Sequence, residues 1–321
     1  MRTQPLAIAA KSVRYPHAVS DGPERRRERR VKRPGRLNRP HFIFNPTALV
    51  GRGKHAGQTT LPWGLPLQYA PSGPMGSAVD RTGIYDLAIT EAIFRLLGPG
   101  DTAVDVGTNV GYMTSIMARR VGSEGRVVCF EPQPAVFSLL EQNIARWKQR
   151  PGALGQIEPH RLALSSAAGR AALNIPEDRD GNHERASLRS FKKQSATVEV
   201  DVRRLDEVVA APARIDLLKV DAERHELDVL EGAEGVLGST TTVIVEEHEV
   251  PPTPVTQLLL EHGFQLYALH ESLAGLRVKP LDPDAPHVGW GPPNVLATRE
   301  PDAVKAALRR PGWRSLRRRS R

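Results

Sequence analysis

The residues best suited to chemistry follow two apolar segments, 102–106 and 126–130, which have the pattern of buried β-strands. Gly107 and Gly111 come after the first segment, and the acid Glu131 comes directly after the second. In a strand–turn–helix–strand unit, glycines let the backbone approach a ligand, and an acid after the second strand accepts hydrogen bonds from ribose hydroxyls. The spacing indicates a site for a cofactor that contains a nucleoside.

The spacing within the turn distinguishes between nucleoside cofactors. The segment reads Asp105-x-Gly107-x-Asn109-x-Gly111, which has one glycine fewer than the G-x-G-x-x-G pattern of dinucleotide sites. A carboxylate at Asp105 would repel a pyrophosphate but suits a ligand with an ammonium or sulfonium charge. S-adenosylmethionine has both charges and no phosphate, so it is the predicted cofactor, and a nicotinamide dehydrogenase is disfavoured. The expected cofactor-binding residues are Asp105, Gly107, Asn109, Gly111, Tyr112, Glu131 and Pro132.

More titratable residues follow two later apolar segments, 215–220 and 241–245. Asp221 directly follows the first segment, and residues 246–249 (Glu-Glu-His-Glu) directly follow the second. Ligands of open α/β sheets lie beyond the carboxyl ends of the strands, so these side chains are expected beside the cofactor. A carboxylate after a buried strand is costly without a partner, and a histidine titrates near neutral pH. We therefore expect Asp221 or His248 to be the catalytic residue that removes a proton from the acceptor.

Composition favours one large domain. The chain has 321 residues, 40% of them hydrophobic, which suffices for a single α/β core. It has no apolar run of about 18 residues, and its early apolar patch is shorter than the ~7–15 residues of a signal peptide core. The single cysteine, Cys129, excludes a disulfide framework and a thiolate metal cluster. We expect a cytoplasmic protein without a membrane span. No metal site is predicted, although acids near Asp221 and Glu246 leave Mg²⁺ dependence open.

The net charge of +9 is concentrated at the ends of the chain, because segments 1–40 and 301–321 are strongly basic. The residues between them are acidic on balance. Residues 25–39 are almost free of apolar side chains and are expected to be disordered. Such arms are either solvated or bind RNA and anionic lipid electrostatically, so nucleic acid is expected only at the tails. Both ends are expected to be removable with little loss of stability.

Periodicity along the chain predicts four parts. Segment 1–40 is a basic tail, 41–79 an irregular Gly/Pro-rich lead-in, 80–300 the cofactor-binding domain, and 301–321 a basic C-terminal tail. Apolar strands alternate with helices expected near 84–97, 134–147, 227–237 and 255–262. This alternation is typical of an α/β fold with an open, mostly parallel sheet and helices on both faces. The polar residues 176–195 are expected to form a surface loop.

Five segments, in order and spacing, resemble the FkbM-like methyltransferases: VDVGTNVGYMT, VVCFEPQPAVFSLLEQNI, LALSSAAGRAAL, IDLLKVDAERHELDVLEGAEGVL and VIVEEHE. The resemblance covers roughly residues 80–270. It implies a Rossmann-like class I fold that uses S-adenosylmethionine, typically for O-methylation of sugars or secondary metabolites. The family pattern K-x-D-x-E-G matches Lys219 to Glu223, but Arg224 stands where the family has glycine. Because arginine does not suit a left-handed turn, the approach to the acceptor pocket is expected to differ.

Three functions remain open from the sequence. The first is methyl transfer to a hydroxyl of a small-molecule acceptor, and the second is methyl transfer to RNA or protein recruited by the basic tails. The third is a pseudoenzyme that only keeps the nucleoside pocket, which Arg224 slightly favours. Methylation of a planar base amine is disfavoured, since segment 215–220 is not followed by an Asn/Asp-Pro-Pro-aromatic segment.

Overall fold

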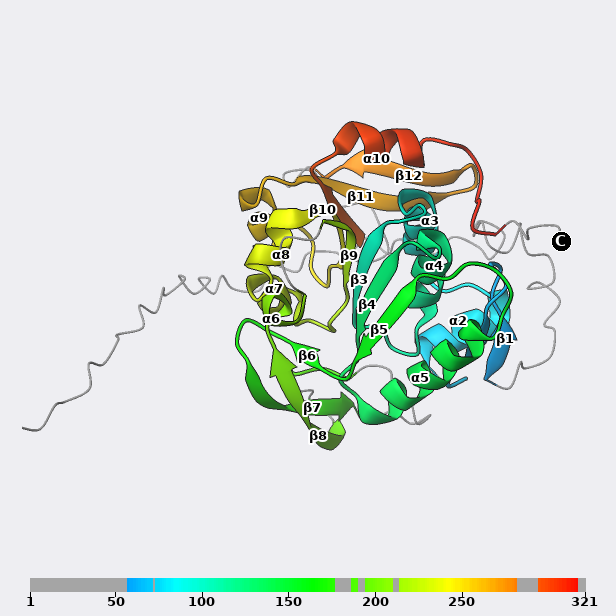
Figure 1. Ribbon diagram of the computed structural model, residues 1–321. Coiled ribbons are helices and arrows are strands. Elements are labelled where there is room, and N and C mark those ends of the chain that lie inside the picture. Colours follow the sequence, from blue (N-terminus) through cyan, green and yellow to red (C-terminus); the bar gives the residue numbers. More distant parts are fainter. Residues whose placement is uncertain are drawn as a thin grey trace, which may run out of the picture. The chain divides into compact units, whose positions relative to one another are not determined.

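The computed structural model describes residues 57–71, 73–176, 186–189, 194–209, 214–281 and 294–316. In this part of the chain the central element is an eight-stranded sheet of order β12-β11-β13-β10-β9-β3-β4-β5 (Figure 1). In that order the strands are Gly275–Pro280, Gln265–Ser272, Asn294–Thr298, Thr240–Glu246, Ile215–Val220, Thr102–Val106, Arg126–Phe130 and Gln156–His160. The strands from β10 to β5 are parallel, whereas β13, β11 and β12 pair antiparallel. The α/β fold with a mostly parallel sheet is therefore confirmed.

The parallel strands are apolar because both of their faces are covered. Along β3, Ala103 packs into one hydrophobic core, while Val104 and Val106 pack into a second core on the other face. Alternate residues of a strand point to opposite faces, so a strand between two helical layers needs apolar residues throughout. Each fully buried valine or leucine contributes roughly 1.5–3 kcal/mol. The same burial fixes the register that brings the ends of these strands to one edge.

Helices cover each face of the sheet (Figure 1). One layer consists of α3 (Leu87–Leu96), α4 (Tyr112–Val121), α5 (Pro134–Lys148) and α10 (Pro301–Leu308). The other consists of α6 (Leu205–Val208), α7 (Glu226–Glu231), α8 (Glu234–Ser239) and α9 (Pro254–Glu261). The single helix expected near 227–237 is divided at Gly232, where a Cβ would lie 2.1 Å from the Ser165 carbonyl oxygen.

A small second sheet has the order β6-β8-β7, formed by Ala163–Leu164, Gln194–Arg203 and Gly169–Pro176. A short segment, 186–189, pairs with it through a bridge between Ser187 and Asn174. Ser187 is only 2% exposed, and its hydroxyl donates to the Glu223 carbonyl at 2.7 Å. The expected surface loop 176–195 is therefore wrong for the buried Ser187 and at its ends, where Pro176 belongs to β7 and residues 194–195 to β8. Most of its other residues lie outside the described residues.

The expectation of an irregular lead-in over 41–79 is wrong for its described residues, which begin at 57. They form β1 (Gln58–Thr60), β2 (Pro66–Gln68) and α2 (Pro74–Thr82). The hairpin packs on α5, where the Trp147 indole N–H donates to the Pro66 carbonyl at 2.6 Å and the Asn143 amide pairs with the backbone of Gln68. The frequent glycines and prolines suggested a loop, whereas tertiary contacts hold these short elements in place.

The C-terminal segment is also part of the fold, as far as residue 316. Val304, Leu308 and Trp313 are buried in the core on the side of α3. Buried Glu91 of α3 accepts hydrogen bonds from the backbone N–H groups of Arg314 and Ser315, both at 2.8 Å. The expectation that 301–321 is a tail that adds nothing to the core is therefore wrong for 301–316. Residues 1–40, 41–56 and 317–321 lie outside the described residues. None of the described helices has the length and apolar character needed to cross a membrane.

Candidate active site

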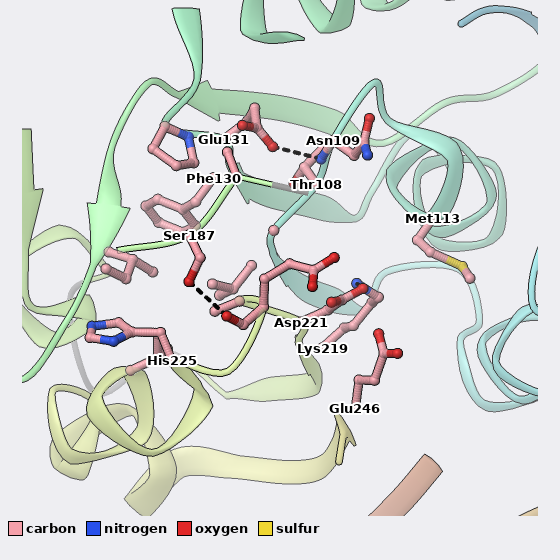
Figure 2. A pocket seen from close by; sticks show the side chains of 18 of the residues that line it. Thr108, Asn109, Met113, Phe130, Glu131, Ser187, Lys219, Asp221, His225 and Glu246 are labelled. Atoms are coloured by element: carbon pink, nitrogen blue, oxygen red, sulfur yellow. Dashed lines mark hydrogen bonds and ion pairs between the residues drawn. The ribbon is translucent and has the colours of Figure 1, made fainter. Parts of the chain in front are cut away.

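A cavity of about 370 Å³ lies at the carboxyl ends of β3, β4, β9 and β10 (Figure 2). This volume is within the range of roughly 300–1,000 Å³ that is usual for small-molecule sites. The cavity is also lined by residues that precede α3, by residues 162–164 and by Ser187. Both expected catalytic residues, Asp221 and His248, line it, as do Gly107, Asn109, Tyr112, Glu131 and Pro132.

The turn after β3 brings the backbone close to the end of β9. The N–H groups of Gly107 and Thr108 both donate to the Phe130 carbonyl, at 3.1 and 3.0 Å. Gly107 has a φ of +73°, and a Cβ there would lie 1.7 Å from the Asp221 carbonyl oxygen. Only glycine fits this conformation and this close approach. The turn therefore brings the strand ends together at the cavity.

Glu131 has a carboxylate that the backbone orients from both sides. Its Oε2 accepts from the Asn109 N–H and its Oε1 from the Gln133 N–H, each at 2.9 Å, and the first bond is drawn in Figure 2. The residue is 8% exposed, and burial raises the pKa of its carboxyl to about 7 against the lowering effect of these two hydrogen bonds. An acid held in this way at the wall of the cavity suits a pair of ribose hydroxyls.

Two of the expected cofactor-binding residues, Asp105 and Gly111, lie behind the cavity wall. Asp105 is fully buried, accepts a 2.5 Å hydrogen bond from the Thr114 hydroxyl, and lies 3.6 Å from the Lys219 ammonium. Gly111 is the N-cap of α4 with a φ of +95°, and a Cβ there would lie 2.7 Å from atoms of Leu140 and Trp147. These two residues therefore support the turn from within the fold.

A cluster of charged side chains occupies the end of the cavity away from Glu131 (Figure 2). The Lys219 ammonium lies 3.1 Å from the Asp221 carboxylate. Burial would lower the pKa of Lys219, but the charges of Asp221 and Asp105 raise it above its ordinary value. The charge of Asp221, together with burial, raises the pKa of Glu246 well above the usual range of a carboxyl group. At neutral pH, Lys219 is therefore charged and Glu246 tends to keep its proton.

Tyr85 and Asp86 also line this cavity, although the sequence did not indicate either as a site residue. Asp86 caps α3, since its Oδ1 accepts from the Ile89 N–H at 3.0 Å, and its Oδ2 accepts from the Asn294 amide at 3.0 Å. Burial raises the pKa of both Tyr85 and Asp86. An aspartate directly before an apolar helical repeat is a typical N-cap, and this signal could have identified residue 86.

His248 lines the cavity from the segment after β10, and its Nε2 lies 3.3 Å from a carboxylate oxygen of Glu226. This hydrogen bond raises the pKa of His248, against the effect of burial. No group of three or more His, Cys, Asp and Glu side chains that could hold a metal ion is found among the described residues.

The turn between β9 and α7 has a left-handed backbone despite the arginine at 224. Glu223 and Arg224 have φ values of 48° and 74°.

We expect Arg224→Gly to raise the free energy of unfolding by about 0.5–1 kcal/mol. A side chain in the left-handed region costs roughly 1–2 kcal/mol, and the greater freedom of glycine in the unfolded chain offsets part of the gain. Urea unfolding measures the change. Arg224→Ala is the control, since alanine keeps the Cβ; an equal gain in both variants would contradict this explanation.

The sheet, the glycine turn and the oriented acid together define an α/β enzyme with a nucleoside site at the edge of a Rossmann-like sheet, the architecture of S-adenosylmethionine-dependent methyltransferases. The methyltransferase FkbM domain matches residues 105–266, about half of the chain. The chain belongs to this family.

Three relatives are similar to the chain over most of their own length. The hexuronic acid methyltransferase AglP of Haloferax volcanii is 32% identical over 201 residues, which are 60% of this chain and 77% of AglP. Methyltransferase sdnD of Sordaria araneosa is 30% identical, over 59% of this chain and 84% of sdnD. The 31-O-demethyl-FK506 methyltransferase FkbM of Streptomyces tacrolimicus is 29% identical, over 55% and 77%.

The protein is therefore an S-adenosylmethionine-dependent methyltransferase, and the pseudoenzyme hypothesis is set aside. The described residues fit the cofactor. The turn at Gly107 leaves no space for a side chain, and Glu131 offers a buried carboxylate at the wall, which suits ribose hydroxyls and would repel a phosphate. When bound, the cofactor supplies an electrophilic methyl group.

The raised pKa of Glu131 predicts that cofactor affinity depends on pH. Below about pH 7 the free protein carries a proton on Glu131, and ribose binding must remove it. We expect the affinity for S-adenosylhomocysteine, measured by calorimetry, to fall roughly tenfold from pH 8 to pH 6. Glu131→Gln should bind at least ~10 times more weakly at pH 8 and show a flatter dependence. Equal affinity of the unaltered protein at both pH values would contradict the assignment.

Proposed function

We propose that this methyltransferase methylates a hydroxyl group of a sugar or secondary-metabolite acceptor. The observation that carries the proposal is the imidazole of His248 at the acid-lined end of the cavity, where a hydroxyl proton needs a base. The name of the relative that acts on 31-O-demethyl-FK506 supports a hydroxyl acceptor, and the hexuronic acid in the name of the other relative supports a sugar.

The charge of the cavity also favours a hydroxyl over a carboxyl acceptor. Asp221 and Glu223 line it, and the one lysine among the described residues of its wall, Lys219, is already paired with two carboxylates. An acceptor carboxylate would be repelled by these groups, whereas hydroxyls can donate hydrogen bonds to them. A polyhydroxyl acceptor therefore fits this end of the cavity.

In the proposed reaction, Glu131 holds the ribose, and the turn at Gly107 and Asn109, with Tyr112 and Pro132, completes the cofactor wall. Asp105 and Gly111 keep that turn in place. His248 or Asp221 accepts the hydroxyl proton while the acceptor oxygen forms its bond to the methyl carbon. The sulfur–carbon bond breaks in the same step, and its electron pair stays on sulfur. The protein's main contributions are orientation and proton removal.

A methyl-acceptor screen tests this proposal. The purified protein is incubated with isotope-labelled S-adenosylmethionine and a panel of sugars, glycosides and polyketide alcohols, and mass spectrometry locates the label. We expect the label on oxygen of one acceptor class. Transfer only to RNA or protein would favour the second function weighed from the sequence. The cytoplasmic location stays a prediction.

A further inference from the structure

One carboxylate oxygen, Oε1 of Glu226, has three polar neighbours from two parts of the chain. It accepts hydrogen bonds from the backbone N–H groups of Ala222 and Arg224, both at 3.0 Å. The His248 ring Nε2 lies 3.3 Å from the same oxygen. Glu226 is 5% exposed and does not line the cavity. Glu226 therefore affects the site through the residues that it contacts and not through contact with a ligand.

The first two contacts hold the turn that carries Asp221. Two successive residues in this turn, Glu223 and Arg224, have left-handed backbones, which are unfavourable for residues other than glycine. The Glu226 carboxylate accepts from two N–H groups of this turn, and the Ser187 hydroxyl donates to the Glu223 carbonyl, a bond drawn as the dashed line from Ser187 in Figure 2. The unusual turn is thus held by its hydrogen bonds.

The third contact determines the chemistry of His248. A carboxylate can only accept, so Nε2 must donate, and the neutral ring then carries its basic lone pair on Nδ1. A histidine base that is oriented by a buried acid in this way has a fixed tautomer and a stabilised protonated form. Among the described residues, the other charged groups that act on His248 include Asp221, Glu223 and the neighbouring Glu247.

We propose that Glu226 is a positioning residue. Its carboxylate fixes the tautomer of His248 and, through the same oxygen, holds the turn that carries Asp221. This inference deepens the proposed function and rests on the role of His248 in it. It predicts that the acceptor proton moves to Nδ1, while Glu226 keeps its hydrogen bond to Nε2.

Glu226→Gln separates the support of the turn from the effect on His248. The amide oxygen still accepts hydrogen bonds from the turn, but it has no charge to stabilise the imidazolium. We expect NMR titration, with the ring signal assigned from His248→Asn, to show the pKa of His248 lowered by about one unit. The acid limb of the pH–rate profile should move in the same direction. We expect kcat to fall roughly tenfold and cofactor affinity to change less than about threefold.

Glu249→Gln is the matched control, since Glu249 is exposed and directly follows His248. It should leave the pKa of His248 nearly unchanged. An unchanged pKa in Glu226→Gln, or an equal shift in both variants, would overturn the inference. If Glu226→Gln is too unstable to titrate, the ¹⁵N chemical shifts of the His248 ring in the unaltered protein test the inference, because they report which ring nitrogen carries the proton. The inference requires that neutral His248 carries it on Nε2, and a proton on Nδ1 would overturn the inference. The NMR titration and the ¹⁵N shifts need no acceptor, so failure to methylate a hydroxyl would refute the proposed function and leave the NMR result standing.

Discussion

Replacing His248 by asparagine is expected to lower kcat by roughly 10²–10⁴, the usual contribution of a positioned general base. Asparagine keeps a polar group of similar size but cannot take up a proton. Cofactor affinity should change little, since the cofactor contacts proposed here lie around Glu131 and the turn at Gly107. Steady-state kinetics with the identified acceptor, together with calorimetry of S-adenosylhomocysteine binding, measures both effects.

The pH dependence distinguishes a base from a structural residue. In the unaltered enzyme, kcat should rise with pH as His248 loses its proton, and the midpoint should lie above the ordinary histidine pKa because Glu226 raises it. In His248→Asn this step should disappear, and the defect should shrink at high pH, where hydroxide replaces the base. Asp221→Asn is the comparison. If it reduces kcat with the same profile while His248→Asn does not, Asp221 is the base.

The largest expected effect on stability concerns Glu91. Its carboxylate lies 2.5 Å from Arg95 Nε, and both side chains are almost fully buried. Arg95 also donates to the carbonyls of Leu308 and Gly312, so the pair fastens the C-terminal segment to α3. Glu91→Ala would leave a buried guanidinium and two backbone N–H groups without this acceptor. We expect a loss of about 3–5 kcal/mol in the free energy of unfolding, measured by urea denaturation.

Arg314→Ala is the control for Glu91→Ala. It removes an exposed side chain but keeps the backbone N–H that donates to Glu91, so its effect should stay within about 0.5 kcal/mol. A comparable loss in both variants, or none in Glu91→Ala, would show that the segment 301–316 is held by other contacts.

The sequence by itself determined the central unit of the protein, since local patterns define it. The strands 102–106 and 126–130 have the predicted bounds, because their apolar runs end at a glycine turn and at an acid. The same patterns were sufficient to predict the cofactor and the family. They also predicted that Asp221 and His248 meet at one edge, because parallel strands bring their carboxyl ends together.

Only the tertiary structure decided which charged residues face the cavity. Asp105 is the next-to-last residue of β3 and is buried against Lys219, whereas Glu131 directly follows β4 and lines the wall. The role of Glu91 depends on backbone groups more than 200 residues away in the chain, which no local pattern reveals. The sequence pattern did not predict the hairpin at 58–68 either, because this hairpin also depends on contacts with distant residues. Its short strands acquire their stability from Trp147 and Asn143 on α5, and contacts between distant segments leave no periodicity in either one.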